Sequence, residues 1–229
     1  MIYVVVDRRR DVILLDFLRD YEKRLTEESL TCEKSFVWFD AFAKRRLSTC
    51  CMSARFETKS VQVELACTRW NLASLLLYLA GDSLVDEPLS DDELKTIVDQ
   101  FQEAAGIFTA LRATMTQLRM DQITNDMEDD TLAALANYSL SGAQATLMAK
   151  ATSAHVKAKL ACGAYELLES IRNYSECPRQ MLDDVTNKTL YFQACAQFYQ
   201  SNKDRDDGKH GLVIARRQNA LAKMQNVSC

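Results

Sequence analysis

The sequence has few residues that interrupt helices, with only six glycines and two prolines among 229 residues. Globular proteins usually contain roughly 12% of these two residues together, and this chain has far less. Sandwiches and barrels of β-strands need many tight turns, which glycine and proline favour. The shortage therefore argues against an all-β fold and favours long helices joined by few connections.

An excess of positive charge is also missing, because 28 lysines and arginines stand against 32 aspartates and glutamates, a net charge of -4. This balance gives no electrostatic reason to expect a nucleic-acid partner. No run of about 18 apolar residues occurs, so no transmembrane segment is expected. The apolar stretch 1–6 is too short for a signal peptide, and we therefore expect a cytoplasmic protein.

Residues that usually carry catalysis or bind metals are scarce. The two histidines, His155 and His210, lie far apart without ligand-type residues at metal spacing, so no metal site is expected. Glycine-rich phosphate loops, dinucleotide-binding motifs and nucleophile elbows are absent. The eight cysteines are scattered without C-x-x-C spacing, which predicts mostly reduced core residues. We expect no cofactor and predict that the chain is not an enzyme.

Apolar spacing along the chain predicts seven helices. The stripe Leu14, Leu18, Tyr21 and Leu25 predicts a helix from Asp11 to about Thr26 with these side chains on its inner face. A nearly all-apolar segment then predicts a central, buried helix over about 61–80. Five further helices are expected over about 90–115, 131–150, 153–171, 178–199 and 212–224.

Two other local patterns stand out. The aromatic and β-branched segment 35–42 and the alternating segment 53–63 predict two short strands, with a third candidate strand at 1–6. Ser90 and Glu93 have the spacing of a capping box, in which each side chain bonds the other residue's amide at the start of a helix. The sequence thus predicts a mainly α fold with one small β-hairpin.

Six short segments in the same order resemble the Bro-one (BRO) domain family, and together they extend over most of the chain. The most specific is the A-A-G-x-F run within F-Q-E-A-A-G-I-F at 101–108. The six segments are 36–42, 70–75, 101–108, 142–145, 158–161 and 211–216. By this resemblance the chain is one partial Bro-one domain over 1–229, lacking the family's N-terminal strands and C-terminal helices.

The resemblance implies a curved, mainly α domain with tetratricopeptide-like antiparallel helix hairpins and a small β-hairpin near residues 35–63. It also implies a non-catalytic module of endosomal sorting that binds an ESCRT-III subunit of the charged multivesicular body protein 4 type. The bound element would be that subunit's C-terminal amphipathic helix, held in a surface groove. Such a protein would be cytoplasmic, recruited to endosomes, and we expect a monomer.

Five residues match the family's partner-binding positions: Asp91, Lys95, Leu147, Val156 and Leu160. The spacing of these residues alone supports a different interpretation. Asp91 and Lys95 then form an ordinary i,i+4 pair in a first helical turn, and the three apolar residues belong to the core. The two interpretations differ in the exposure that they predict for Val156 and Leu160.

Two other functions remain open at this point. One is a rhophilin-like signalling scaffold that uses the same fold to bind another peptide. The other is an incomplete structural fragment without a binding function of its own. A pull-down of partners separates the first from ESCRT-III binding, and a cooperative thermal melt counts against the second.

Overall fold

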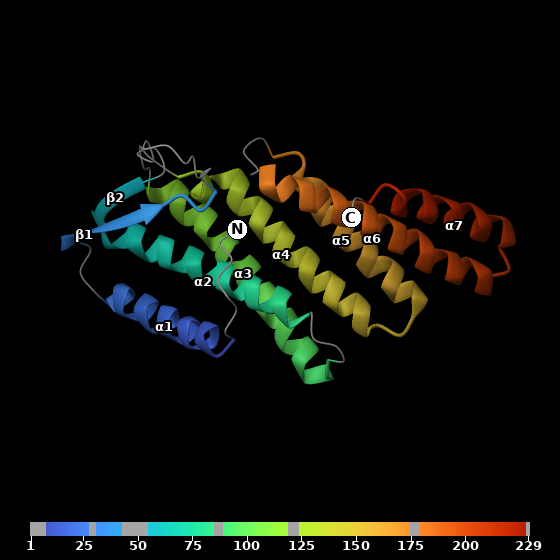
Figure 1. The fold of residues 1–229 in the computed structure, drawn as a ribbon, viewed down its shortest axis with the longest axis horizontal. Coiled ribbons are helices and arrows are strands. Elements are labelled where there is room, and N and C mark those ends of the chain that lie inside the picture. Colours follow the sequence, from blue (N-terminus) through green and yellow to red (C-terminus); the bar gives the residue numbers. More distant parts are fainter. Residues whose placement is uncertain are drawn as a thin grey trace.

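The computed structural model describes residues 8–27, 31–42, 55–84, 89–118, 124–174 and 179–227. In this part of the chain the fold is mainly α, as predicted, with one small two-stranded sheet (Figure 1). The elements in chain order are α1 (Arg8–Glu27), β1 (Thr31–Phe39), β2 (Arg55–Ser60), α2 (Val61–Ser83), α3 (Asp91–Leu118), η2 (Asn125–Met127), α4 (Asp129–Lys150), α5 (Ala154–Ile171), α6 (Arg179–Asp206) and α7 (His210–Met224).

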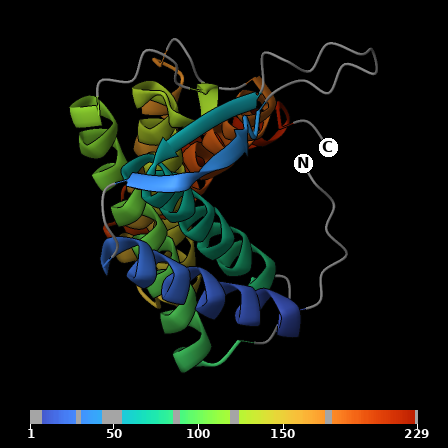
Figure 2. The same ribbon diagram turned by 90° about the vertical axis from the view of Figure 1, so that its left-hand side faces the viewer.

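The helices from α2 to α7 form an elongated array in which each helix packs mainly against the next one in the sequence (Figure 1). Helix α1 packs on α2, and the two strands lie at the same end of the molecule (Figure 2). Helices α4 and α6 also meet, as shown by the Tyr138 hydroxyl of α4, which donates a hydrogen bond to Asp184 Oδ2 of α6 at 2.6 Å. Successive helices therefore lie alternately in two layers, as in tetratricopeptide-like hairpins.

The two strands pair in antiparallel fashion, with Trp38 opposite Phe56. The predicted second strand extended to residue 63, but the structure ends it at Ser60. The Ser60 hydroxyl there accepts a hydrogen bond from the Val63 amide at 3.4 Å and so caps α2. The candidate strand at 1–6 lies outside the described residues.

A buried glutamate joins the sheet to the first two helices. Glu64, on α2, accepts hydrogen bonds from the Trp38 indole nitrogen at 2.7 Å and from the Tyr21 hydroxyl at 2.8 Å. Only 5% of Glu64 is exposed, so these partners satisfy a carboxylate that has little contact with water. The contacts fix β1 and α1 against the central helix.

The core is built mainly from the helices that the sequence predicts as most apolar. Phe108 and Leu111 of α3 are completely buried. The Trp70 ring of α2 packs edge-on against the Phe108 ring, with the two ring centroids 6.4 Å apart. A second cluster, which includes Leu168 and Val185, fills the space between α4, α5 and α6. The array is therefore held together along its length by apolar contacts between successive helices.

The predicted capping box is present at the start of α3. Glu93 Oε2 accepts a hydrogen bond from the Ser90 amide at 2.7 Å, and the Ser90 hydroxyl accepts one from the Glu93 amide at 3.3 Å. The bonds from the Ser90 hydroxyl and amide lower the pKa of Glu93, because they stabilise its ionised form. This cap fixes the helix end that carries two of the predicted site residues.

The predicted inner face of α1 is right for Leu18, Tyr21 and Leu25, which are buried or half-buried, and wrong for its first residue, Leu14. Leu14 is 45% exposed, whereas its neighbour Leu15 is only 7% exposed and lies in the core. Residues 12–15 are all apolar, so the spacing fits a stripe that begins at either leucine. The packing of α1 on α2 selects Leu15 and leaves Val12, Ile13 and Phe17 on the surface.

The last two helices are joined at Gly208, whose φ of 73° lies in the left-handed region that glycine adopts without strain. Beyond this turn, Arg216 Nε of α7 donates to Asp204 Oδ2 of α6 at 2.6 Å. The Asp204 side chain is only 4% exposed. The Arg216 guanidinium holds the pKa of Asp204 below its usual range.

This ion pair predicts that acid weakens the contact between α6 and α7. Because the pKa of Asp204 is lower in the folded state, the pair's stabilisation is present above the ordinary value of 3.8 and disappears as the pH falls through the folded value. Protection of α7 amides against hydrogen exchange, corrected for intrinsic rates, should fall only below about pH 4. Asp204→Asn should lose this protection already at neutral pH.

The matched control for this experiment is Asp206→Asn, since Asp206 is an exposed residue of the same helix. It should keep the exchange pattern of the unmodified chain. Unchanged neutral-pH protection in Asp204→Asn would show that the ion pair does not hold α7 in place.

Candidate partner-binding face

The predicted site residues lie near the adjoining ends of three helices. Asp91 and Lys95 lie in the first two turns of α3, Leu147 lies in the last turn of α4, and Val156 and Leu160 lie in the first two turns of α5. An ion pair joins the first two of these helix ends, with Lys150 Nζ 3.3 Å from Asp91 Oδ1. The start of α3 therefore lies beside the turn between α4 and α5.

Exposure separates the three apolar residues of this group. Leu147 is 37% exposed and Val156 is 44% exposed, whereas Leu160 is half-buried and packs on the cluster between α4, α5 and α6. The interpretation from spacing, which places all three in the core, is therefore wrong for Leu147 and Val156. For Leu160 it is partly right.

For Val156, the interpretation from spacing failed because α5 buries mainly alanines. The residues that α5 buries are mainly small, and they bring its backbone close to α4 and α6. A pattern that counts only large apolar side chains selects the wrong face of such a helix. The buried residues are Ala158, Ala161, Ala164, Leu168 and Ile171.

The exposed apolar strip continues along α4 to Leu140. Leu140 is 37% exposed and precedes Leu147 by two helical turns, so both side chains lie on one face of α4. Asp129 precedes Leu140 by about three turns and lies on the same face, and its Oδ2 is 2.7 Å from Arg112 Nη2 of α3. This face of α4 is therefore bounded on one side by α3.

Helix α5 bounds the other side. A Cβ atom at Gly163 of α5 would lie 3.6 Å from the Gln144 side chain of α4, so the two helices come close here. Val156 precedes Gly163 by two turns and lies on the same edge of α5. We define the candidate face as Asp91, Lys95, Leu140, Leu147 and Val156, with Leu160 at its buried margin.

The two charged residues of the candidate face play different parts. The Asp91 side chain is 81% exposed and pairs with Lys150, an interaction that is worth only about 0–1 kcal/mol at the surface. Lys95 is exposed, and among the described residues it forms no ion pair with Asp91 or any other carboxylate. The candidate face therefore carries exposed apolar side chains and a solvent-facing ammonium group.

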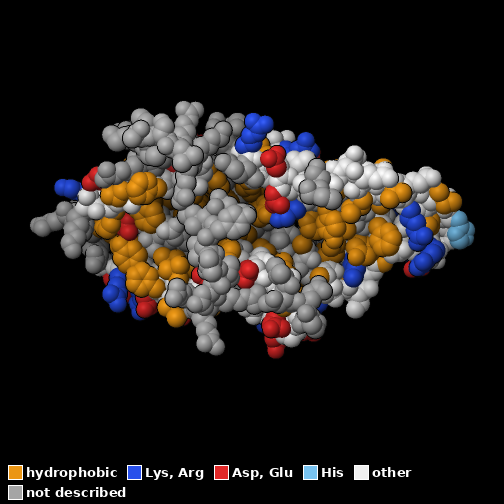
Figure 3. Space-filling view, in the orientation of Figure 1, with side chains coloured by type: hydrophobic (Ala, Val, Ile, Leu, Met, Phe, Trp, Pro, Cys, Tyr) orange, Lys and Arg blue, Asp and Glu red, His pale blue; other side chains and the backbone are white. Residues whose placement is uncertain are grey.

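Exposed apolar side chains also gather elsewhere, over α1 and over α6 (Figure 3). They include Phe17, which is 62% exposed, and Phe198, which is 46% exposed. Exposure alone therefore does not identify a binding site in this molecule. The candidate face differs because it also contains the charged residues that the family resemblance selects.

Within the described part of the chain, no three histidine, cysteine, aspartate or glutamate side chains come together to hold a metal ion. Of the helices described, none has the length and apolarity needed to cross a membrane.

Cys67 is a buried free thiol, as expected for a core cysteine, and burial together with the nearby Glu64 and Asp126 raises its pKa to about 12. Both its burial and its raised pKa disfavour the reactive thiolate at neutral pH.

The fold and the order of its segments agree with a comparison against known families. A family model described as the BRO1-like domain matches residues 15–228. The chain belongs to this family, which confirms the resemblance to the Bro-one domain.

Individual relatives give the same assignment. The chain is 29% identical over 204 residues to mouse programmed cell death 6-interacting protein, and this match covers 85% of the chain and 23% of the relative. It is 30% identical over 203 residues to apoptosis-linked gene 2-interacting protein X 1 of Caenorhabditis elegans, covering 81% and 22%. The chain thus spans about a quarter of the length of these relatives.

A solved structure shows the same fold. The ALIX BRO1 CHMP4C complex superimposes with a TM-score of 0.82 at 24% sequence identity, over 99% of this chain and 66% of the solved chain. The mainly α array with its small sheet is therefore the BRO1 fold.

Proposed function

We propose that this chain is a non-catalytic interaction module that binds the C-terminal amphipathic helix of an ESCRT-III subunit, of the charged multivesicular body protein 4 type, on the candidate face. The observation that carries the proposal is the exposure of Leu140, Leu147 and Val156 near the helix ends that the Asp91–Lys150 ion pair joins. Lys95 is exposed one turn after Asp91 and forms no ion pair with a described residue. Family membership and the solved complex of ALIX BRO1 with CHMP4C support this choice of partner.

Binding on this face follows the physics of an amphipathic helix in an apolar groove. Apolar side chains of the partner would bury Leu147 and Val156, which removes from water two side chains that the chain alone leaves partly exposed. Lys95 would pair with a carboxylate of the partner. The Asp91–Lys150 ion pair would hold the end of α4 against the start of α3, so that the apolar and charged groups keep their spacing.

We expect Kd to be near the micromolar range, because a single helix loses conformational entropy when it orders on binding. Recruitment by an ESCRT-III subunit would bring a cytoplasmic protein to endosomes. One relative, of Emericella nidulans, is a vacuolar protein-sorting protein.

The direct test is a fluorescence titration of the purified chain with a labelled C-terminal helix of a charged multivesicular body protein 4. Leu147→Asp and Val156→Asp should each weaken binding at least about tenfold, because each places a charge in a contact that excludes water. Since both side chains are more than a third exposed, thermal melting of both variants should remain close to that of the unmodified chain.

Leu212→Asp on α7 is the matched control, because Leu212 is 49% exposed and lies outside the candidate face. It makes the same change in side chain and charge and should leave Kd unchanged. Leu160→Asp is a poorer test, since Leu160 packs on the core cluster and a charge there also lowers stability.

Failure of the folded chain to bind this helix would refute the proposal and would favour the rhophilin-like scaffold that binds another peptide. Equal loss of binding in Leu212→Asp would also refute it. A melt without cooperativity would instead support the interpretation as an incomplete structural fragment.

A further inference from the structure

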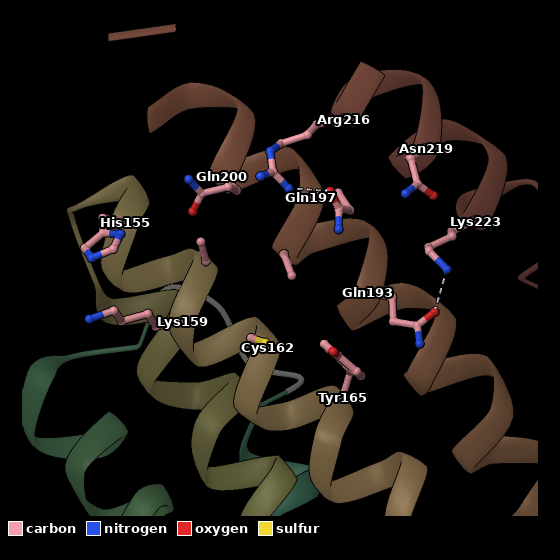
Figure 4. A pocket seen from close by; sticks show the side chains of 12 residues that line it. His155, Lys159, Cys162, Tyr165, Gln193, Gln197, Gln200, Arg216, Asn219 and Lys223 are labelled. Atoms are coloured by element: carbon pink, nitrogen blue, oxygen red, sulfur yellow. Dashed lines mark hydrogen bonds between the residues drawn. The ribbon is translucent and has the colours of Figure 1, made fainter. Parts of the chain in front are cut away.

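A concave surface separate from the candidate face lies along α5. It is a pocket of about 610 Å³ between α5, α6 and α7 (Figure 4). His155 and Lys159 of α5 lie towards one end of this pocket, and Lys223 of α7 lies towards the other. None of its lining residues belongs to the candidate face.

The pocket is lined by cations without acidic residues. Of the described residues that line it, none is aspartate or glutamate, whereas Lys159, Arg216 and Lys223 are present. Arg216 is already neutralised by the buried Asp204. The two lysines form no ion pair with a described residue, although Lys223 Nζ donates to Gln193 Oε1 at 2.7 Å. The lining therefore favours an anionic ligand.

Amide side chains occupy the length of the pocket between these charges. Gln193, Gln197 and Gln200 follow one another at i, i+4 and i+7, so they line one side of α6 over about 10 Å. Asn219 of α7 adds another amide. An amide side chain both donates and accepts hydrogen bonds, as the main chain of an extended peptide does. About three residues of such a peptide span this length.

We infer that the pocket between α5, α6 and α7 binds an extended acidic segment of a partner protein. The lysines pair with carboxylates at the two ends of the pocket, and the row of amides holds the main chain between them. A single phosphate group fits less well, because Lys159 and Lys223 lie towards opposite ends and do not converge on one point (Figure 4).

The test uses the full chain and a fluorescein-labelled short peptide of alternating glutamate and serine, with fluorescence anisotropy as the readout. Binding should saturate and should weaken as salt is raised from about 50 to about 500 mM. A peptide with glutamine in place of glutamate should not bind. Lys159→Glu should raise Kd at least about fivefold, and Lys223→Glu should have a similar effect.

Lys23→Glu is the matched control, since Lys23 is an exposed residue of α1 and its replacement makes the same change in net charge. It should leave Kd unchanged. Arg216 is unsuitable for replacement, because its loss would leave the buried Asp204 without its partner.

A second readout places the peptide in the pocket. Cys162 lines it, whereas Cys195 of α6, which is also partly buried, does not, and both are free thiols. Bound peptide should suppress alkylation of Cys162 by iodoacetamide, measured by peptide mass spectrometry, and should leave the alkylation of Cys195 unchanged.

Three results would overturn the inference: no binding of the glutamate peptide, equal binding of the glutamine peptide, or equal affinity in Lys159→Glu and Lys23→Glu. Binding of inositol hexakisphosphate without binding of the peptide would also overturn it in favour of a phosphate ligand. The ESCRT-III helix is titrated in parallel. Leu147→Asp should weaken binding of that helix but should not change binding of the glutamate peptide, so failure of this inference can be told apart from failure of the proposed function.

Discussion

Replacing Phe108 with alanine is expected to lower the free energy of unfolding by about 3–5 kcal/mol. The Phe108 side chain is completely buried and meets the Trp70 ring edge-on. Its removal loses the apolar surface that it buries and leaves a cavity at the centre of the main core, where the surrounding helices can relax only in part. Chemical denaturation of the purified variant measures the change.

Phe17→Ala is the control for this prediction, because Phe17 undergoes the same change but is 62% exposed on α1. It should change the free energy of unfolding by no more than about 0.5 kcal/mol. A small effect at Phe108, comparable with that at Phe17, would contradict the packing of α3 at the centre of the core.

Replacing Gly142 with alanine is expected to destabilise the chain by about 1–3 kcal/mol, although alanine is the better helix former. A Cβ atom at this position of α4 would lie 2.6 Å from Cε1 of the Phe101 ring. Phe101 is only 4% exposed, so its ring cannot move into solvent to make room. Glycine is therefore needed here for the close approach of α3 and α4.

The control is Gly106→Ala in the middle of α3, where nothing lies within 4 Å of the new Cβ. Gly106 is exposed, and the change should stabilise the chain by about 0.5–1 kcal/mol through helix propensity alone. Opposite signs for the two glycines are the expected result. Stabilisation by Gly142→Ala would show that α3 and α4 are not so close at this point.

Most of the fold could be predicted from the sequence, because the helices carry long apolar stripes and clear boundaries. The capping box of Ser90 and Glu93 lies where the spacing of these residues predicts it. The inward face of each helix was harder to predict. On α1 the apolar residues cover more than one face, and only contact with α2 decides that Leu15 is buried and Leu14 is not.

The candidate face could not be derived from spacing alone. Val156 and Leu160 continue a stripe that ordinarily belongs to a core, and only the family resemblance selected them as surface residues. The structure exposes Val156 because alanines bring α5 close to its neighbours on another side. The pocket between α5, α6 and α7 was missed, since its residues come from three helices and the spacing within any one helix does not show which face meets the other two.

The packing of each helix mainly on its neighbour in the sequence has a consequence for folding. Contacts between chain segments that follow one another close short loops, so the average sequence separation of contacts is low and folding should be fast. Such an array also opens in parts, because each helix mainly contacts the helices before and after it in the sequence. The contacts between α6 and α7 can therefore open while the core around Phe108 remains intact.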